Sequence, residues 1–226
     1  MLSTFKRTKI NIWKFIIIIA GVLGVADWGI MTANGDSVIS LFNFTFLAIA
    51  ALISLTIIFG WPATKRLFSK LRKEDWKWIL FAIIADIVLT CLFVFIGSFL
   101  KQPIANNSGV EEAFSLIDLV FSLPTLSISL AGEELFIATL FILVYIIAYK
   151  FFKEKTTVIL AVIISLSLFE LSHYTVYNGN LYQCLVIIGL GHLPTMYAWL
   201  KTETLWVPII AHILYDVLLL ALSTLG

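Results

Sequence analysis

Two adjacent carboxylates, Glu133 and Glu134, lie near the start of an apolar run that continues to Tyr149. The chain has no Lys or Arg from Pro103 to Tyr149, so no cation of the same segment can pair with them. A carboxylate inside a membrane is costly, and such residues usually mark functional sites. We therefore expect the partners of this pair to come from other segments of the chain.

The three histidines, His173, His192 and His212, all lie in the last third of the chain, each within an apolar stretch. His212 and Asp216 are four residues apart, which places them on one face of a helix. A Glu that takes a proton from water, a His that shares it and a His/Asp face that holds an oxyanion are the parts needed for hydrolysis. The alternative for each His is a hydrogen-bonded packing residue.

The composition predicts an integral membrane protein, because 61% of the residues are hydrophobic, 13% are charged and the mean hydropathy is +1.02. The net charge of +1 gives no sign of nucleic-acid binding. We therefore expect the lipid bilayer as a partner and no nucleic acid. The two cysteines, Cys91 and Cys184, are interpreted as apolar packing residues.

Seven apolar stretches are long enough, or nearly so, to cross a bilayer as helices, which takes about 20 residues each. They lie at about 12–33, 38–60, 78–100, 126–149, 157–176, 181–200 and 204–224. Before the fourth span, Glu111 to Leu123 is predicted to form a short amphipathic helix at the interface that Pro124 ends. No linker divides the chain, and the runs are too apolar for barrel strands. The sequence thus predicts an all-α transmembrane helix bundle forming a single domain over 1–226, with 12–33 as a retained signal anchor.

The basic residues predict the orientation in the membrane. Of the fifteen Lys and Arg residues, Lys101 alone falls on one side of the predicted bundle. The others cluster near the N-terminus, at 65–77, at 150–155 and at Lys201. The positive-inside rule then gives a multi-pass protein of the cell membrane with a cytoplasmic N-terminus and an extracytoplasmic C-terminus.

Three short motifs follow one another along the second half of the chain. They are the pair Glu133-Glu134, the FxxxH pattern from Phe169 to His173, and the HxxxD pattern from His212 to Asp216. In order, in spacing and in membrane placement they resemble the CAAX protease and bacteriocin-processing family of intramembrane proteases, also called CPBP or Abi. Its pattern is EExxxR, FxxxH and HxxxN or HxxxD. The family-like catalytic core would span about 111–224.

This resemblance implies a role for each matching residue. Glu133 would be the general base that activates water, His173 would assist it, and His212 with Asp216 would stabilise the oxyanion. Glu134, Phe169 and His192 are expected in supporting positions. The resemblance implies an endopeptidase without a cofactor, and a zinc ion held by Glu133, His173 and His212 is the alternative.

The resemblance also implies a peptide or a membrane-associated protein as substrate. Leader peptides of bacteriocins and signalling peptides are the expected classes, with prenylated CAAX tails as the eukaryotic case. Cleavage would take place near the cytoplasmic or mid-bilayer level. The sequence carries no signal for the oligomeric state.

One position departs from the family pattern, because Ala138 stands where EExxxR has its Arg. Glu134 would then either stay protonated, as burial favours, or hydrogen-bond to groups from neighbouring spans. His192, which is otherwise a packing residue at a bend, is the nearest unclaimed candidate. The departure also favours an alternative function as a non-catalytic member, such as a bacteriocin self-immunity factor or a modulator of another membrane protein. A proton or ion carrier is a third possibility, although no inverted repeat is visible.

Overall fold

A computed structural model of the chain describes residues 38–105, 116–174 and 176–224, with the backbone alone over 38–45. It also describes Phe5, Trp13, Lys14 and Ile16. This part of the chain is all helical and contains no strand, which confirms the predicted all-α class. Most of the predicted span at 12–33 and the start of the predicted interfacial helix at Glu111 lie outside the described residues.

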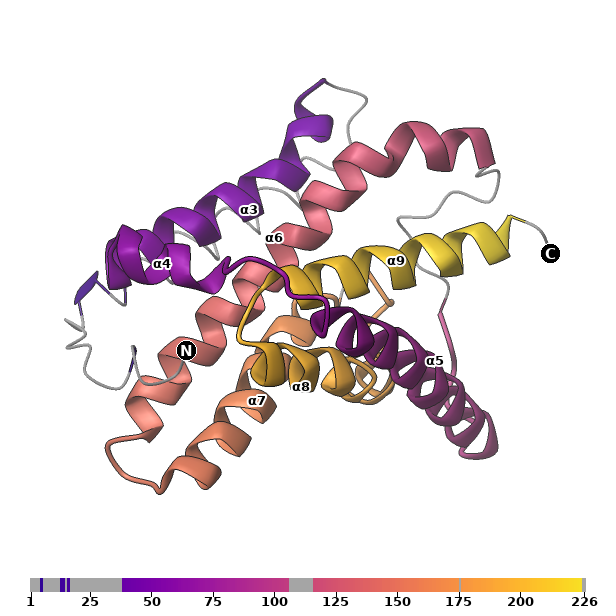
Figure 1. The fold of residues 1–226 in the computed structure, drawn as a ribbon. Helices are drawn as coiled ribbons and strands as arrows, with labels where there is room; N and C mark the ends of the chain where they lie inside the picture. The colour runs from indigo at the N-terminus through magenta and orange to yellow at the C-terminus, as the bar shows by residue number, and fades with distance from the viewer. Residues whose placement is uncertain are drawn as a thin grey trace.

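Seven α-helices and one π-helix follow one another over the described ranges (Figure 1). They are α3 (Val38–Phe59), α4 (Trp61–Leu67), α5 (Asp75–Phe99), α6 (Leu116–Ala148), α7 (Glu154–Leu171), η1 (Gln183–Leu190), α8 (Leu193–Thr202) and α9 (Trp206–Ser223). By length and composition, four segments of the described chain could cross a membrane: α5, α6, the stretch Gln183–Thr202 that comprises η1 and α8, and α9. The protein is therefore a multi-pass membrane protein.

Helix α6 corrects the sequence-based prediction around Pro124. No separate interfacial helix ends there, because α6 runs through Pro124 and is 33 residues long. Proline is tolerated inside membrane helices where neighbouring hydroxyl groups bond to the backbone. Ser122 Oγ donates to the carbonyl of Leu119, and Thr125 Oγ1 donates to that of Ser122, both at 2.9 Å. The first turns of α6 run in a different direction from the rest of the helix (Figure 1), as expected for a helix kinked at proline.

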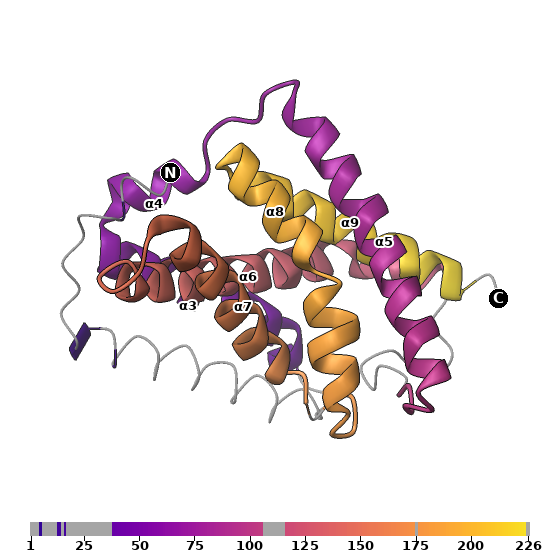
Figure 2. The ribbon, with the colours of Figure 1, turned by 90° about the horizontal axis from the view of Figure 1, so that it is seen from below.

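Helix α6 crosses the middle of the molecule and packs against α3, α7 and α9 (Figure 2). Its buried side chains are concentrated from Leu130 onward, where they join one apolar cluster with residues of α3, α7 and α8. Gly132 lets α3 approach closely, since a Cβ atom there would lie 2.8 Å from the backbone nitrogen of Ala48. The packing therefore places the turn that carries Glu133 and Glu134 at the centre of the helix bundle.

A second group of helices covers the other side of this centre. Helix α5 packs against α8 and α9 (Figures 1 and 2). Asp86 of α5 is buried and accepts a hydrogen bond from Thr195 of α8 at 2.5 Å. This hydrogen bond ties α5 to α8, as polar side chains often do between membrane helices.

Candidate active site

The carboxylate of Glu134 is the meeting point of three helical segments. Glu134 is buried in α6, and its Oε1 atom lies 2.7 Å from Nδ1 of His212 in α9, at hydrogen-bond distance. The same oxygen lies 3.0 Å from Nε2 of His192, the residue that precedes α8. The two imidazole rings contact each other edge to face, with centroids 5.1 Å apart. As expected, the partners of Glu134 come from distant segments.

The contact between His192 and Glu134 differs from an ordinary hydrogen bond. Although Nε2 of His192 lies 3.0 Å from the carboxylate, it has no hydrogen-bond partner of suitable geometry in the part of the chain that the structure describes. Ala138, one turn further along α6, is fully buried in the apolar cluster and offers no charge. Two imidazoles from other segments thus lie beside Glu134, while an apolar side chain stands at the position of the motif Arg.

The His212 ring faces a carboxylate on each of its nitrogens. Its Nδ1 atom contacts Glu134, and its Nε2 atom lies 3.9 Å from Oδ2 of Asp216, one helical turn away. The second distance is too long for a direct hydrogen bond. A proton on Nε2 could therefore be donated to another group while Asp216 supplies negative charge nearby.

Glu133 points in another direction from Glu134, because neighbours on an α-helix differ by about 100°. It is half-buried, and its charge interacts with those of His212, Asp216 and Glu134. Among the described residues, no hydrogen bond joins Glu133 to His173. The structure thus brings Glu133 near the His212–Asp216 pair but leaves it unbonded to its expected assistant.

His173 lies in the turn that follows α7 and is held by the Phe of its motif. The ring of Phe169 is buried and contacts the His173 ring edge to face, with centroids 5.0 Å apart. Glu170, the next residue of the same motif, is buried and has its Oε2 atom 3.8 Å from His173 Nδ1. Glu170 is not one of the residues that define the three motifs, although an acidic residue inside an apolar stretch is itself a signal of a functional site.

Three side chains of the site could together hold a metal ion. Ligand atoms of Glu134, His192 and His212 all lie within 4.8 Å of one another, and no other such group of three occurs over 38–105, 116–174 and 176–224. Two His and one Glu form a ligand set that zinc uses in hydrolytic enzymes. The sequence-based alternative named Glu133 and His173 beside His212, whereas the structure groups His212 with Glu134 and His192.

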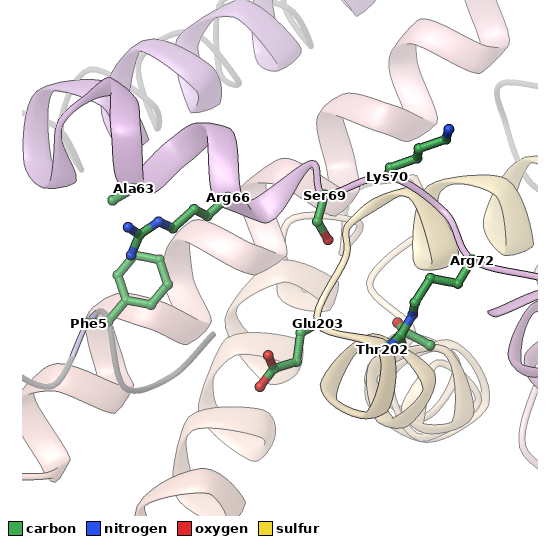
Figure 3. Close-up of a pocket in the computed structure, with 8 residues that line it drawn as sticks. All are labelled: Phe5, Ala63, Arg66, Ser69, Lys70, Arg72, Thr202 and Glu203. Atoms are coloured by element: carbon green, nitrogen blue, oxygen red, sulfur yellow. The ribbon is translucent and has the colours of Figure 1, made fainter. Parts of the chain in front are cut away.

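A cavity of about 390 Å³ lies away from these residues, where the turn after α4 meets the turn between α8 and α9 (Figure 3). It is lined by Phe5, Ala63, Arg66, Ser69, Lys70, Arg72, Thr202 and Glu203. Arg66 lies beside Phe5, and Lys70 points away from the other side chains. The pKa of Arg72 is raised by its hydrogen bond with Asp75. Because no predicted site residue lines this cavity, it does not belong to the candidate active site.

Residues 113–218 match the family model of the type II CAAX prenyl endopeptidase, Rce1-like. This stretch contains all three motifs and the whole cluster around Glu134. The resemblance to the CPBP family is thereby confirmed, and residues 113–218 form an Rce1-like domain of this family of CAAX-type intramembrane proteases. Comparisons with curated proteins and with solved structures give no significant match.

Proposed function

We propose that this protein is an intramembrane endopeptidase in which a glutamate activates the attacking water and no metal ion is needed. The observation that carries the proposal is the convergence of motif residues inside the Rce1-like domain. Glu133, His212 and Asp216 interact electrostatically, and Glu134 is bonded to His212 beside them. The chain thus combines a general base with groups suited to stabilising an oxyanion.

In the proposed reaction, Glu133 takes a proton from water while the water oxygen attacks the carbonyl carbon of the substrate peptide bond. His173 shares this proton and helps to pass it to the leaving amine when the C–N bond breaks. General acid–base catalysis of this kind contributes roughly 10²–10⁴-fold in rate. The site lies in the middle of the bundle, which fits a substrate that reaches it from the membrane.

His212 supplies the oxyanion stabilisation in this proposal. Its Nδ1 atom is engaged by Glu134, whereas Nε2 lies 3.9 Å from Asp216, too far for a direct hydrogen bond, and would donate to the oxyanion. The negative charge of Asp216 favours a proton on that nitrogen. An oxyanion donor of this type is worth roughly 10²–10³-fold in kcat.

The substrates that fit this proposal are peptides and membrane-associated proteins, with bacteriocin leader peptides and signalling peptides as the classes to test first. The N-terminus would lie in the cytoplasm and the C-terminus outside it. Cleavage would then take place near the cytoplasmic or mid-bilayer level.

Ala138 favours a second candidate function, that of a non-catalytic family member such as a bacteriocin self-immunity factor. The side chain is fully buried among apolar groups, so α6 supplies no cation to its carboxylates. In this alternative the Glu134–His212 contact serves the scaffold alone. The motif residues Glu133, His173, His212 and Asp216 are all present, which favours the enzyme.

The deciding experiment is proteolysis of a candidate peptide library by the purified protein in liposomes. We expect cleavage by the wild type, loss of cleavage in Glu133→Ala and no effect of metal chelators. Cleavage by Glu133→Ala at the wild-type rate would contradict the proposed mechanism. Loss with a chelator and recovery with zinc would replace it by a metal-dependent one, and a folded wild type that cleaves no peptide would favour the non-catalytic function.

A further inference from the structure

Glu170 is a buried carboxylate that the proposed reaction does not use. It lies in the last turn of α7 with 1% of its surface exposed. Neither of its carboxylate oxygens has a hydrogen-bond partner within the described ranges. Leaving one buried polar group unsatisfied costs about 1–3 kcal/mol, and a charged group costs more. A buried group of this kind needs a functional or structural reason.

A second polar group with the same deficit belongs to His173. Its Nδ1 atom is buried and has no hydrogen-bond partner in the described chain, and it lies 3.8 Å from Oε2 of Glu170. A donor and an acceptor thus face each other at slightly more than hydrogen-bond distance. Catalytic hydrogen bonds are often long in the absence of substrate and shorten in the reacting complex.

The surroundings hold both side chains in this arrangement. The Phe169 ring contacts the His173 ring edge to face on one side, and the Tyr177 ring lies with its centroid 6.4 Å from that of His173. Gly189 of the π-helix η1 packs against Glu170, since a Cβ atom at 189 would lie 3.2 Å from the Glu170 Cγ atom. The missing side chain at Gly189 therefore leaves space for the Cβ and Cγ atoms of Glu170. Short π-helices are frequent at functional sites.

We propose that Glu170 is a positioning residue for His173: its carboxylate accepts a hydrogen bond from Nδ1–H and leaves the Nε2 lone pair free for the reaction centre. The partner of one imidazole nitrogen decides which nitrogen carries the proton. A buried carboxylate that holds a His in the required tautomer has this role in hydrolytic triads. The inference rests on the proposed function, in which His173 shares the proton that Glu133 takes from water.

The first test observes the His173 ring itself and needs no substrate. Full-length protein labelled with ¹⁵N-histidine in lipid nanodiscs would be compared with Glu170→Leu and Glu170→Gln. We expect His173 to carry its proton on Nδ1 in the wild type and to move toward the Nε2–H form in Glu170→Leu. Glu154→Gln, at the opposite end of α7, is the matched control and should leave the His173 signals unchanged. A wild type with the Nε2–H form, or an unchanged tautomer in Glu170→Leu, would overturn the inference.

The second test is kinetic and uses the peptide identified for the wild type. Glu170→Gln should lower kcat by roughly 10²–10⁴-fold, the range for lost acid–base catalysis, with KM nearly unchanged. Wild-type cleavage with no effect of Glu170→Gln would overturn the positioning role and leave the proposed function standing. If the wild type cleaves nothing, the proposed function fails, and the NMR comparison still decides whether Glu170 holds His173.

Discussion

The carboxylate of Glu134 and the imidazole of His212 are hydrogen-bonded at 2.7 Å although 78 residues separate them in the chain. Nε2 of His192 lies 3.0 Å from the same carboxylate oxygen. The contact with His212 joins α6 to α9, and the contact with His192 joins α6 to the turn between η1 and α8. A buried acid with imidazole neighbours keeps an unpaired charge out of the bilayer without the arginine of the family motif.

The first prediction concerns the coupling of Glu134 with His192. Each of Glu134→Ala and His192→Ala should destabilise the bundle, and the double variant should cost less than their sum by roughly 0.5–3 kcal/mol, as for residues in contact. Denaturation in mixed detergent micelles measures these free energies. The control is the double variant of Glu134→Ala and Glu74→Gln, since Glu74 is an exposed residue before α5. The effects of these two substitutions on the free energy of unfolding should be additive. Additivity of the first pair as well would show that the contact at 3.0 Å contributes nothing.

The second prediction separates the two adjacent carboxylates. Glu133→Gln should lower kcat by roughly 10²–10⁴-fold, because it removes the proposed base, and should leave the unfolding midpoint nearly unchanged. Glu134→Gln should lower the unfolding midpoint in addition to kcat, since it alters the hydrogen bond to His212. Initial cleavage rates and thermal unfolding of the same preparations measure both effects. A variant of Glu133 with wild-type turnover would assign the base elsewhere.

The third prediction concerns the close approach of α3 and α6. Gly132→Ala should destabilise the protein by roughly 1–3 kcal/mol, the range for overpacking, because the new Cβ atom would lie 2.8 Å from a backbone nitrogen of Ala48. Ala48→Gly in the same chain should restore little, since the clash involves backbone. Full recovery in this double variant would show that the side chain of Ala48 makes the contact.

The fourth prediction concerns the tie between α5 and α8. Thr195→Val should destabilise the bundle by about 1–3 kcal/mol, because it leaves the buried Asp86 without its donor. Thr202→Val is the matched control, as the buried hydroxyl of Thr202 bonds only to carbonyls of its own helix in the described structure. Equal losses in the two variants would contradict a specific role of the Asp86 contact.

The fifth prediction is the orientation in the membrane. In a background with Cys91 and Cys184 replaced, a cysteine at position 154 should react with an impermeant reagent from the cytoplasmic side, and one at position 178 from the outside. The physical reason is the one-sided distribution of Lys and Arg. Labelling of position 154 in intact cells would reverse the assignment.

The sequence by itself determined the class of protein and indicated candidate residues for the site. Its apolar composition requires helices that satisfy their own backbone hydrogen bonds in lipid. FxxxH and HxxxD are local patterns whose members lie one helical turn apart, so their spacing already indicated the contact of Phe169 with His173 and the proximity of His212 to Asp216. Pro124 was misread because proline within a membrane helix can kink the helix without ending it.

Only the tertiary structure decided which groups meet. Which of Glu133 and Glu134 faces the imidazoles depends on the rotation of α6 about its axis. That rotation is fixed by packing against α3, α7 and α9, including the close approach at Gly132. The contacts of Glu134 with His192 and His212, and the placement of Glu170 beside Gly189 of η1, join distant segments of the chain. Such contacts follow from the complementary shapes of helix surfaces, which no local spacing of residues encodes.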